Sequence, residues 1–207
     1  MEKQLRLAAR HLSQNDAHLA PVIARRGLAH FVPHTDYYRS LTDSIISQQL
    51  SVTAAASIQR RFRELFGGDF PAPELLLQKS LAEVRSVGLS GAKAHYIRDL
   101  AAHISDGRLT FDKLDQQSNE QIIAELTDVT GIGDWTAHMF LMFCLGRLDV
   151  LPIGDLGIRH GLRALYHLPA VPTPTEVRDL AVANHWHPYE SVASWYVWES
   201  LDNKPKV

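Results

Sequence analysis

A short glycine-containing stretch carries the clearest chemistry in the sequence. Residues Leu126–Ala137 read Leu-Thr-Asp-Val-Thr-Gly-Ile-Gly-Asp-Trp-Thr-Ala, which predicts a helix that ends at a tight Gly-Ile-Gly turn and a second helix that starts at once. Glycine permits positive φ and close backbone approach, and the first N–H groups of a helix lack partners within it. Such amides would form an uncharged site for a phosphate. The alternative is an ordinary corner between two helices.

A second candidate group is the carboxylate of Asp155, in the segment Leu151–His160. A helix is expected to begin there, and the positive end of a helix dipole favours a charged carboxylate. An ordinary N-cap is the alternative, since Asp is a preferred capping residue. The stretch Trp186–Trp198 is dense in aromatic residues, which fits either a core stripe or a binding pocket. The one cysteine, Cys144, lies in an apolar run and is predicted to be a core residue rather than a nucleophile.

The elements that must position these residues are predicted to be helical almost throughout. Three segments have the capping-box pattern, in which Ser or Thr is followed three residues later by Glu or Gln: Ser80–Glu83, Ser118–Gln121 and Thr173–Glu176. The apolar pattern of 37–66 is too long for one typical helix, so we expect a break near Gln48–Ser51, with Ser51 capping the second helix. Few stretches alternate as strands do, and Asp149–Ile153 is predicted to be an extended connector.

Composition sets only broad limits on function. The chain has 207 residues, 45% hydrophobic and 21% charged, which is an ordinary globular balance. A single cysteine excludes an internal disulfide and fits a reducing, intracellular compartment. No secretory signal or membrane span is apparent. The net charge of −2 argues only weakly against nucleic acid, because local charge decides DNA binding.

Taken together, these motifs resemble those of a known family. The Gly131–Gly133 turn is similar to the helix-hairpin-helix motif of the HhH-GPD DNA glycosylases, and Asp155 lies at that family's usual distance after it. The last aromatic stretch looks like that of the DNA-3-methyladenine glycosylase II branch. The resemblance implies one all-α domain over residues 1–207 with two lobes, roughly 36–145 and the N-terminal helices plus 146–207. It also implies an active-site cleft between the lobes.

The resemblance implies a catalytic role for Asp155. In this family the aspartate stabilises the positive charge that develops on the sugar as the N-glycosidic bond breaks, or activates the attacking water. Relatives with lyase activity carry a lysine two residues after the second hairpin glycine, where this chain has Trp135. Because indole forms no Schiff base, a monofunctional enzyme that uses water is expected.

The resemblance also implies a base pocket and a DNA-binding surface. Trp135, Trp198 and Met139 would line the pocket, where indole faces attract cationic alkylated purines such as 3-methyladenine and 7-methylguanine. A wedge would fill the gap left by the flipped base, with Gln49 as the best match and Leu50 as its neighbour. The expected DNA-binding residues are Gln48, Gln49, Leu50, Gly131, Gly133, Thr136 and Lys93.

No cofactor is expected to be required, although hairpin carbonyls of Thr127, Val129 and Ile132 would be placed to bind Na⁺ or K⁺. The expected partner is duplex DNA containing damaged bases, bound by a monomer with no membrane role. Its location would be cytoplasmic, at the nucleoid, in a bacterium or nuclear in a eukaryote. The arginines Arg60, Arg61 and Arg63 are predicted to be a solvated helix face.

Four departures from the family pattern concern substrate range and affinity. The sequence begins near the helical core, so the N-terminal β domain of some longer relatives is expected to be absent. Asp134 replaces a basic hairpin residue, Met139 stands where some relatives have a tyrosine, and Glu190 replaces a common arginine. Two other functions stay open: a non-catalytic DNA-binding module and a helical interaction scaffold. Among enzymes, a glycosylase for ethenoadenine or a deaminated base is the alternative.

Overall fold

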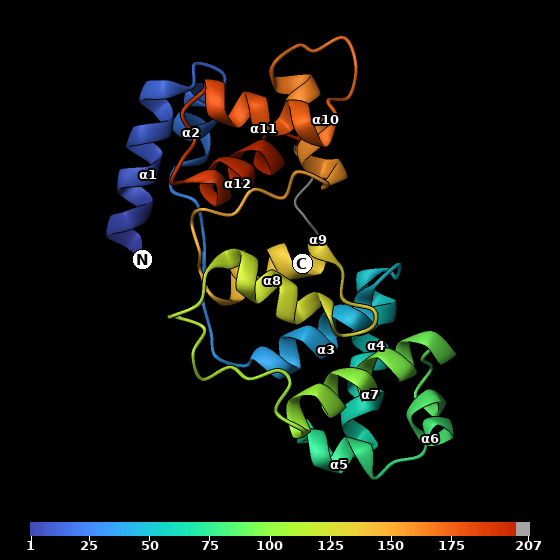
Figure 1. The fold of residues 1–207 in the computed structure, drawn as a ribbon. Coiled ribbons are helices and arrows are strands. Elements are labelled where there is room, and N and C mark those ends of the chain that lie inside the picture. Colours follow the sequence, from blue (N-terminus) through green and yellow to red (C-terminus); the bar gives the residue numbers. More distant parts are fainter. Residues whose placement is uncertain (202–207) are drawn as a thin grey trace. The chain divides into compact units, whose positions relative to one another are not determined.

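The computed structural model describes residues 1–201, which form twelve α-helices and one π-helical turn, η1 (Phe140–Cys144), with no strand among them (Figure 1). The predicted all-α class is thereby confirmed. The chain divides into two compact units. The continuous unit is His34–Phe140, and the discontinuous unit combines Met1–Pro33 with the chain from Leu141 onward. Within the described residues, no helix has both the length and the apolar character needed to cross a membrane.

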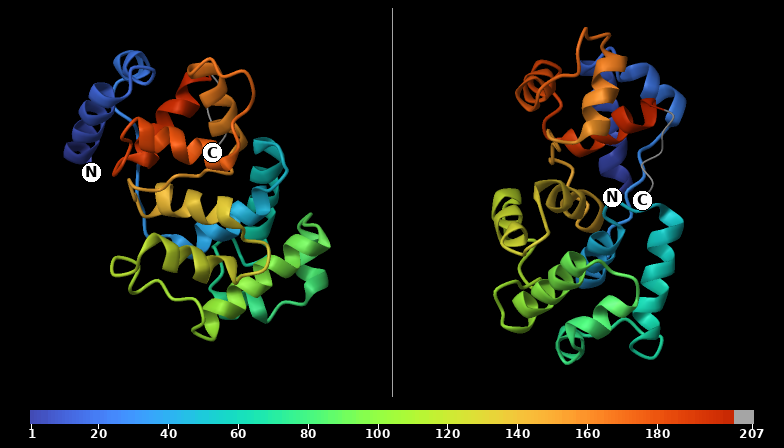
Figure 2. Two further views of the ribbon diagram at one scale, coloured as in Figure 1. Left: turned by 45° about the horizontal axis from the view of Figure 1, so that its top comes forward. Right: turned by 90° about the vertical axis from the view of Figure 1, so that its right-hand side faces the viewer.

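The continuous unit is arranged around one long helix, α7. It contains α3 (Tyr37–Ser47), α4 (Val52–Glu64), α5 (Pro73–Leu77), α6 (Leu81–Ser86), α7 (Gly91–Ser105), α8 (Asn119–Thr127) and α9 (Asp134–Met139). Helix α7 packs against α3, α5 and α6, while α8 packs against α9 (Figures 1 and 2). Its apolar side chains Ile97 and Leu100 are fully buried, so α7 forms the centre of this core.

The discontinuous unit joins the two ends of the described chain. It contains α1 (Glu2–Asn15), α2 (Ala20–Arg26), α10 (Leu156–Leu165), α11 (Pro174–Ala183) and α12 (Glu190–Ser200). Helix α12 packs against α1, α2 and α10. Trp186 and Tyr196 are fully buried in its core, and Trp195 is half-buried. Tyr196 donates a hydrogen bond from its hydroxyl to the Gly27 carbonyl at 2.7 Å.

The helix boundaries follow the local signals in the sequence. All three predicted capping boxes are present, at the starts of α6, α8 and α11. The expected break separates α3 from α4, and the Ser51 side chain accepts the Ala54 N–H. Val52, the first residue of α4, is 51% exposed and lies outside the core. Cys144 is buried, as predicted.

Candidate active site

Asp155 occupies the position immediately before α10. It is the N-cap of that helix, and its Oδ1 accepts the Ile158 N–H at 2.7 Å. The residue is only 9% exposed. The ordinary capping role considered above is therefore present. The same arrangement places a carboxylate at the positive end of a helix dipole, next to backbone N–H groups.

The indole of Trp198 fixes the same carboxylate oxygen. Its Nε1 donates a hydrogen bond to Asp155 Oδ1 at 3.0 Å, from the neighbouring helix α12. Trp198 is 6% exposed, and its ring lies 6.1 Å from that of Phe143 in a stacked orientation. Since Oδ1 accepts from both a backbone amide and an indole, the carboxylate is held in one orientation.

Two glycines of α10 allow this helix to lie close to α12. A Cβ on Gly157 would lie 3.0 Å from both Asp155 Oδ1 and Trp198 Nε1, and a Cβ on Gly161 would lie 2.5 Å from the Val197 side chain. Neither glycine belongs to a motif that predicts a role for it. The available signal was their spacing of four residues within one helix, where each costs about 1 kcal/mol relative to Ala. Here they allow α10 and α12 to approach closely.

The hairpin lies in the continuous unit and has the predicted form. Helix α8 ends at Thr127 and α9 begins at Asp134. Gly131 has φ +89°, and a Cβ there would lie 2.2 Å from the Tyr96 ring, so only glycine fits. The second glycine of the turn does not use that freedom. Gly133 has φ −105° and ψ 175°, because it is the extended N-cap of α9 and its carbonyl accepts the Ala137 N–H.

The carbonyls expected to bind a cation lie along the same turn. The Val129 carbonyl accepts the Ile132 N–H at 3.1 Å, which closes the turn. The side chains of Val129 and Ile132 are buried, at 0% and 4% exposure. Thr127 donates its hydroxyl to the Ile123 carbonyl at 2.8 Å. Among residues 1–201, no three His, Cys, Asp or Glu side chains gather as metal ligands, but a carbonyl site would not use such groups.

The turn between α3 and α4, which we call the wedge turn (Gln48–Leu50), is held from two sides. Gln48 donates its Nε2–H to the Gly131 carbonyl at 2.9 Å, which ties this turn to the hairpin. Lys93 donates from Nζ to the carbonyls of Ile46, at 2.8 Å, and of Gln48. Burial lowers the pKa of Lys93. Gln48 and Lys93, both predicted to bind DNA, therefore have partners within the protein.

The other two residues of the wedge turn are exposed. Gln49 has φ +57°, an uncommon conformation for a residue with a side chain, and Leu50 is 39% exposed. A leucine held on an exposed turn suits insertion into a base stack. Which of the two enters the duplex stays a prediction.

The remaining predicted site residues are divided between the units. Trp135 is 51% exposed, whereas Thr136 is buried and Met139 is half-buried, all on α9 of the continuous unit. Trp198 belongs to the discontinuous unit. A pocket formed jointly by Trp135, Met139 and Trp198 therefore stays a prediction.

Two of the residues that depart from the family pattern lie at the starts of helices. Asp134 lies in the first turn of α9, and Glu190 Oε1 contacts His187 Nδ1 at 3.0 Å at the start of α12. Arg60 and Arg61 are exposed, and Arg60 pairs with Glu64 at 2.6 Å. Arg63 is half-buried. The predicted solvated face is correct for the first two of these arginines.

The sequence profile of the HhH-GPD superfamily base excision DNA repair proteins matches residues 42–184, a stretch that includes the hairpin and Asp155. The chain belongs to this superfamily. It is 36% identical to DNA-3-methyladenine glycosylase 1 of Schizosaccharomyces pombe, with 79% of this chain and 72% of that protein covered. It is 32% identical to a Bacillus subtilis protein named putative DNA-3-methyladenine glycosylase YfjP, of which it spans 59% and which covers 80% of this chain.

Solved structures of the superfamily have the same fold. A DNA-3-methyladenine glycosidase from Bacillus halodurans superposes with a TM-score of 0.84 at 36% identity, covering 93% of this chain and 88% of that one. The Schizosaccharomyces pombe 3-methyladenine DNA glycosylase in complex with abasic DNA gives a TM-score of 0.77 at 31% identity, with 97% and 98% covered. The predicted family and its 3-methyladenine glycosylase branch are thus confirmed.

Proposed function

We propose that this protein is a monofunctional DNA glycosylase that excises alkylated purines, such as 3-methyladenine and 7-methylguanine, from duplex DNA. The observation that carries the proposal is the buried carboxylate of Asp155, held by the Ile158 N–H and the Trp198 indole at the start of α10. The relatives named DNA-3-methyladenine glycosylase support the choice of substrate.

Asp155 is the residue to which we assign catalysis. Cleavage of an N-glycosidic bond develops positive charge on the sugar, and a fixed carboxylate stabilises that charge most when it needs no reorganisation. Two hydrogen bonds to Oδ1 at 2.7 and 3.0 Å supply this rigidity. The carboxylate would also orient or deprotonate the attacking water.

Water is the expected nucleophile because no lysine occupies the hairpin position that carries one in bifunctional relatives. Trp135 stands there, 51% exposed. Lys93, in the same unit, donates to two backbone carbonyls. The product is a free base and an abasic site.

DNA binding is assigned to the continuous unit. Amides of Gly131, Gly133 and Thr136 would bind a phosphate, and Gln49 or Leu50 would fill the space of the flipped base. Carbonyls of Thr127, Val129 and Ile132 would bind a monovalent cation that neutralises the phosphate. No other cofactor takes part, and the protein acts as an intracellular monomer.

Base recognition is assigned to the tryptophans. Alkylated purines such as 3-methyladenine are cationic, and indole faces attract cations. Trp135 offers an exposed indole for this purpose. Trp198 is largely buried beside Asp155. Its main role is therefore to donate a hydrogen bond to the carboxylate, and contact with the base is a secondary role.

The test is release of bases from methylated duplex DNA by the wild-type protein and by Asp155→Asn. The wild type should release 3-methyladenine, and the variant should be slower by about 100-fold or more, because one preorganised charge is lost. Asp179→Asn, which removes an exposed carboxylate from α11, is the matched control and should retain full activity. Duplex binding without base release by the wild type would contradict the enzyme and favour a DNA-binding module.

A further inference from the structure

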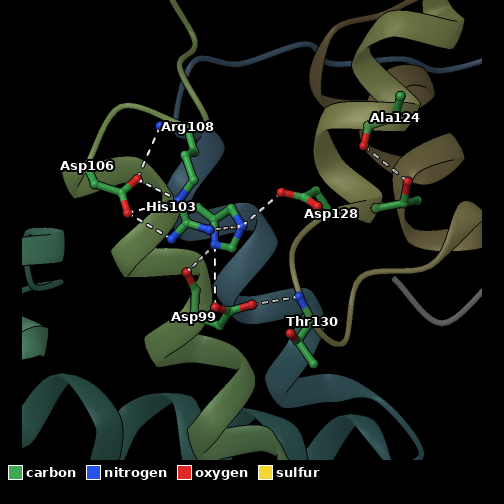
Figure 3. Close-up of polar contacts among 8 residues, drawn as sticks. Asp99, His103, Asp106, Arg108, Ala124, Asp128 and Thr130 are labelled. Atoms are coloured by element: carbon green, nitrogen blue, oxygen red, sulfur yellow. Dashed lines mark hydrogen bonds and ion pairs between the residues drawn. The ribbon is translucent and has the colours of Figure 1, made fainter.

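One face of α7 contacts both of the turns to which DNA binding is assigned. Lys93, Tyr96, Asp99 and His103 follow one another at steps of three or four residues, which places them on one side of a helix. Lys93 donates to one carbonyl just before the wedge turn, that of Ile46, and to one within it, that of Gln48. Tyr96 packs against Gly131, and Asp99 and His103 bind the ends of the hairpin, as Figure 3 shows.

The Asp99 carboxylate holds the backbone of the hairpin. Its Oδ2 accepts the Thr130 N–H at 2.8 Å, one residue before Gly131 (Figure 3). The side chain is 23% exposed. Partial burial is the largest single influence and raises the pKa of Asp99, but hydrogen bonding to Thr130 together with nearby positive charge, including that of Arg108, outweighs it, so the pKa is lowered. The bond is therefore charge-assisted, which makes it stronger than one between neutral groups.

His103 lies behind Asp99 and is 3% exposed. Its Nδ1 lies 2.9 Å from the Asp99 carbonyl and 3.5 Å from Asp99 Oδ1. Its Nε2 lies 3.2 Å from Asp128 Oδ2 and 2.7 Å from an Arg108 nitrogen (Figure 3). Asp128 is the C-cap of α8, so the imidazole connects α7 to the residue where the hairpin begins.

We propose that Asp99 is a positioning residue for DNA binding, which sets the hairpin backbone through the Thr130 amide with His103 as its support. The proposal rests on the assignment of phosphate binding to the amides of Gly131 and Gly133. Asp99 itself touches no DNA. It fixes the turn in the conformation in which these amides point at the phosphate.

If Asp99 acted only through its negative charge, it would weaken DNA binding instead of supporting it. A carboxylate close to a phosphate-binding turn repels the phosphate, so its removal should tighten DNA binding if it acted only through its field. A positioning role requires that its removal weaken binding. The direction of the change in Kd therefore separates the two roles.

The experiment measures Kd for a duplex containing an abasic site by fluorescence anisotropy, for the wild type, Asp99→Ala, Asp99→Asn and Asp106→Asn. Asp99→Ala should raise Kd about tenfold, as expected for loss of a charge-assisted hydrogen bond. Asp99→Asn, whose amide oxygen can still accept the Thr130 N–H, should recover most of the loss. Asp106→Asn removes a carboxylate from the same cluster that binds Arg108 and not the hairpin, so its Kd should be unchanged or lower.

Turnover on methylated DNA and thermal melting complete the test. Positioning predicts that Asp99→Ala raises KM while kcat at saturating DNA stays within about twofold. Unchanged or tighter binding by folded Asp99→Ala would overturn the proposal, as would a weakening that Asn does not recover at an unchanged melting temperature. Failure of the wild type to release any base would overturn the glycosylase function instead, and the binding measurement would still decide the role of Asp99.

Discussion

At the scale of single residues, the proposed reaction depends on three neighbouring residues, from α10, from α12 and from the position before α10. Asp155 supplies the carboxylate, Trp198 supplies an N–H donor to it, and Gly157 supplies the space in which they meet. Each of the three has a separate task. Substitutions that remove one task at a time should therefore have different signatures.

Trp198→Phe keeps an aromatic ring but removes the donor to Asp155. Release of both a charged lesion, 3-methyladenine, and a neutral lesion, hypoxanthine, should slow by a similar factor of roughly ten, because a bond to a charged group is lost. Single-turnover rates on the two substrates provide the measurement. A loss confined to the charged lesion would mean that the indole acts through cation–π attraction instead.

Gly157→Ala should disturb the same group from the other side. Its Cβ would lie 3.0 Å from Asp155 Oδ1 and from Trp198 Nε1, so the carboxylate and the indole must each shift from their present positions. We expect base release to fall at least tenfold, with duplex binding by the hairpin unchanged. Gly154→Ala, where a Cβ meets nothing within 4 Å, is the control, and an equal loss there would argue against this explanation.

At the scale of elements, the hairpin depends on glycine at one position more than at the other. Gly131→Ala combines a positive φ of +89° with a Cβ 2.2 Å from the Tyr96 ring. It should lower the free energy of unfolding by about 2 kcal/mol or more. Gly133→Ala has an extended backbone and no atom within 4 Å, so its cost should stay below about 1 kcal/mol. Chemical denaturation measures both, and equal costs would contradict this difference.

The stability of the protein should depend on pH through His138 in helix α9. Burial lowers the pKa of His138, although Asp134 acts in the opposite direction. In the unfolded chain a histidine takes up its proton near pH 6.5. As the pH falls below that value, the unfolded state binds more protons than the folded one and stability decreases.

Melting temperatures measured from pH 7.5 to 5 should therefore fall less steeply for His138→Gln than for the wild type. The wild-type chain has 11 histidines, so the difference between the two curves isolates this one. Parallel curves would show that His138 titrates alike in both states.

The helix boundaries could be read from the sequence because their causes are local. Capping boxes such as Ser118–Gln121, and the break capped by Ser51, depend on residues within one turn of each other. The partners of Lys93, Gln48 and Asp99 could not be read in this way. Each of them meets a backbone group tens of residues away, and only packing of the helices decides which group that is.

The candidate site was predictable in part for the same reason. Asp155 could be located by its motif and its helix start, but its contact with Trp198 joins residues that are 43 positions apart. The glycines of α10 were visible in the sequence without an assigned role. Their purpose depends on α12, which no local pattern of α10 specifies.

At the scale of the whole molecule, the reaction should end at the abasic site. Borohydride reduction of a mixture with abasic duplex should trap no covalent adduct, because Trp135 replaces the Schiff-base lysine and indole cannot act as one. Denaturing electrophoresis detects any adduct. Efficient trapping would contradict the monofunctional assignment, and its loss in Lys93→Arg would identify Lys93 as the amine responsible.

During synthesis on the ribosome, the continuous unit is completed before the discontinuous unit. Residues 34–140 form one continuous stretch, so this unit has its full set of helices well before translation ends. Helices α1 and α2 are made earlier, yet their partner α12 begins only at Glu190. At typical bacterial rates that interval is on the order of ten seconds. During that interval α1 and α2 lack their contacts with α12, and apolar surface left uncovered in this way makes a nascent chain prone to aggregation.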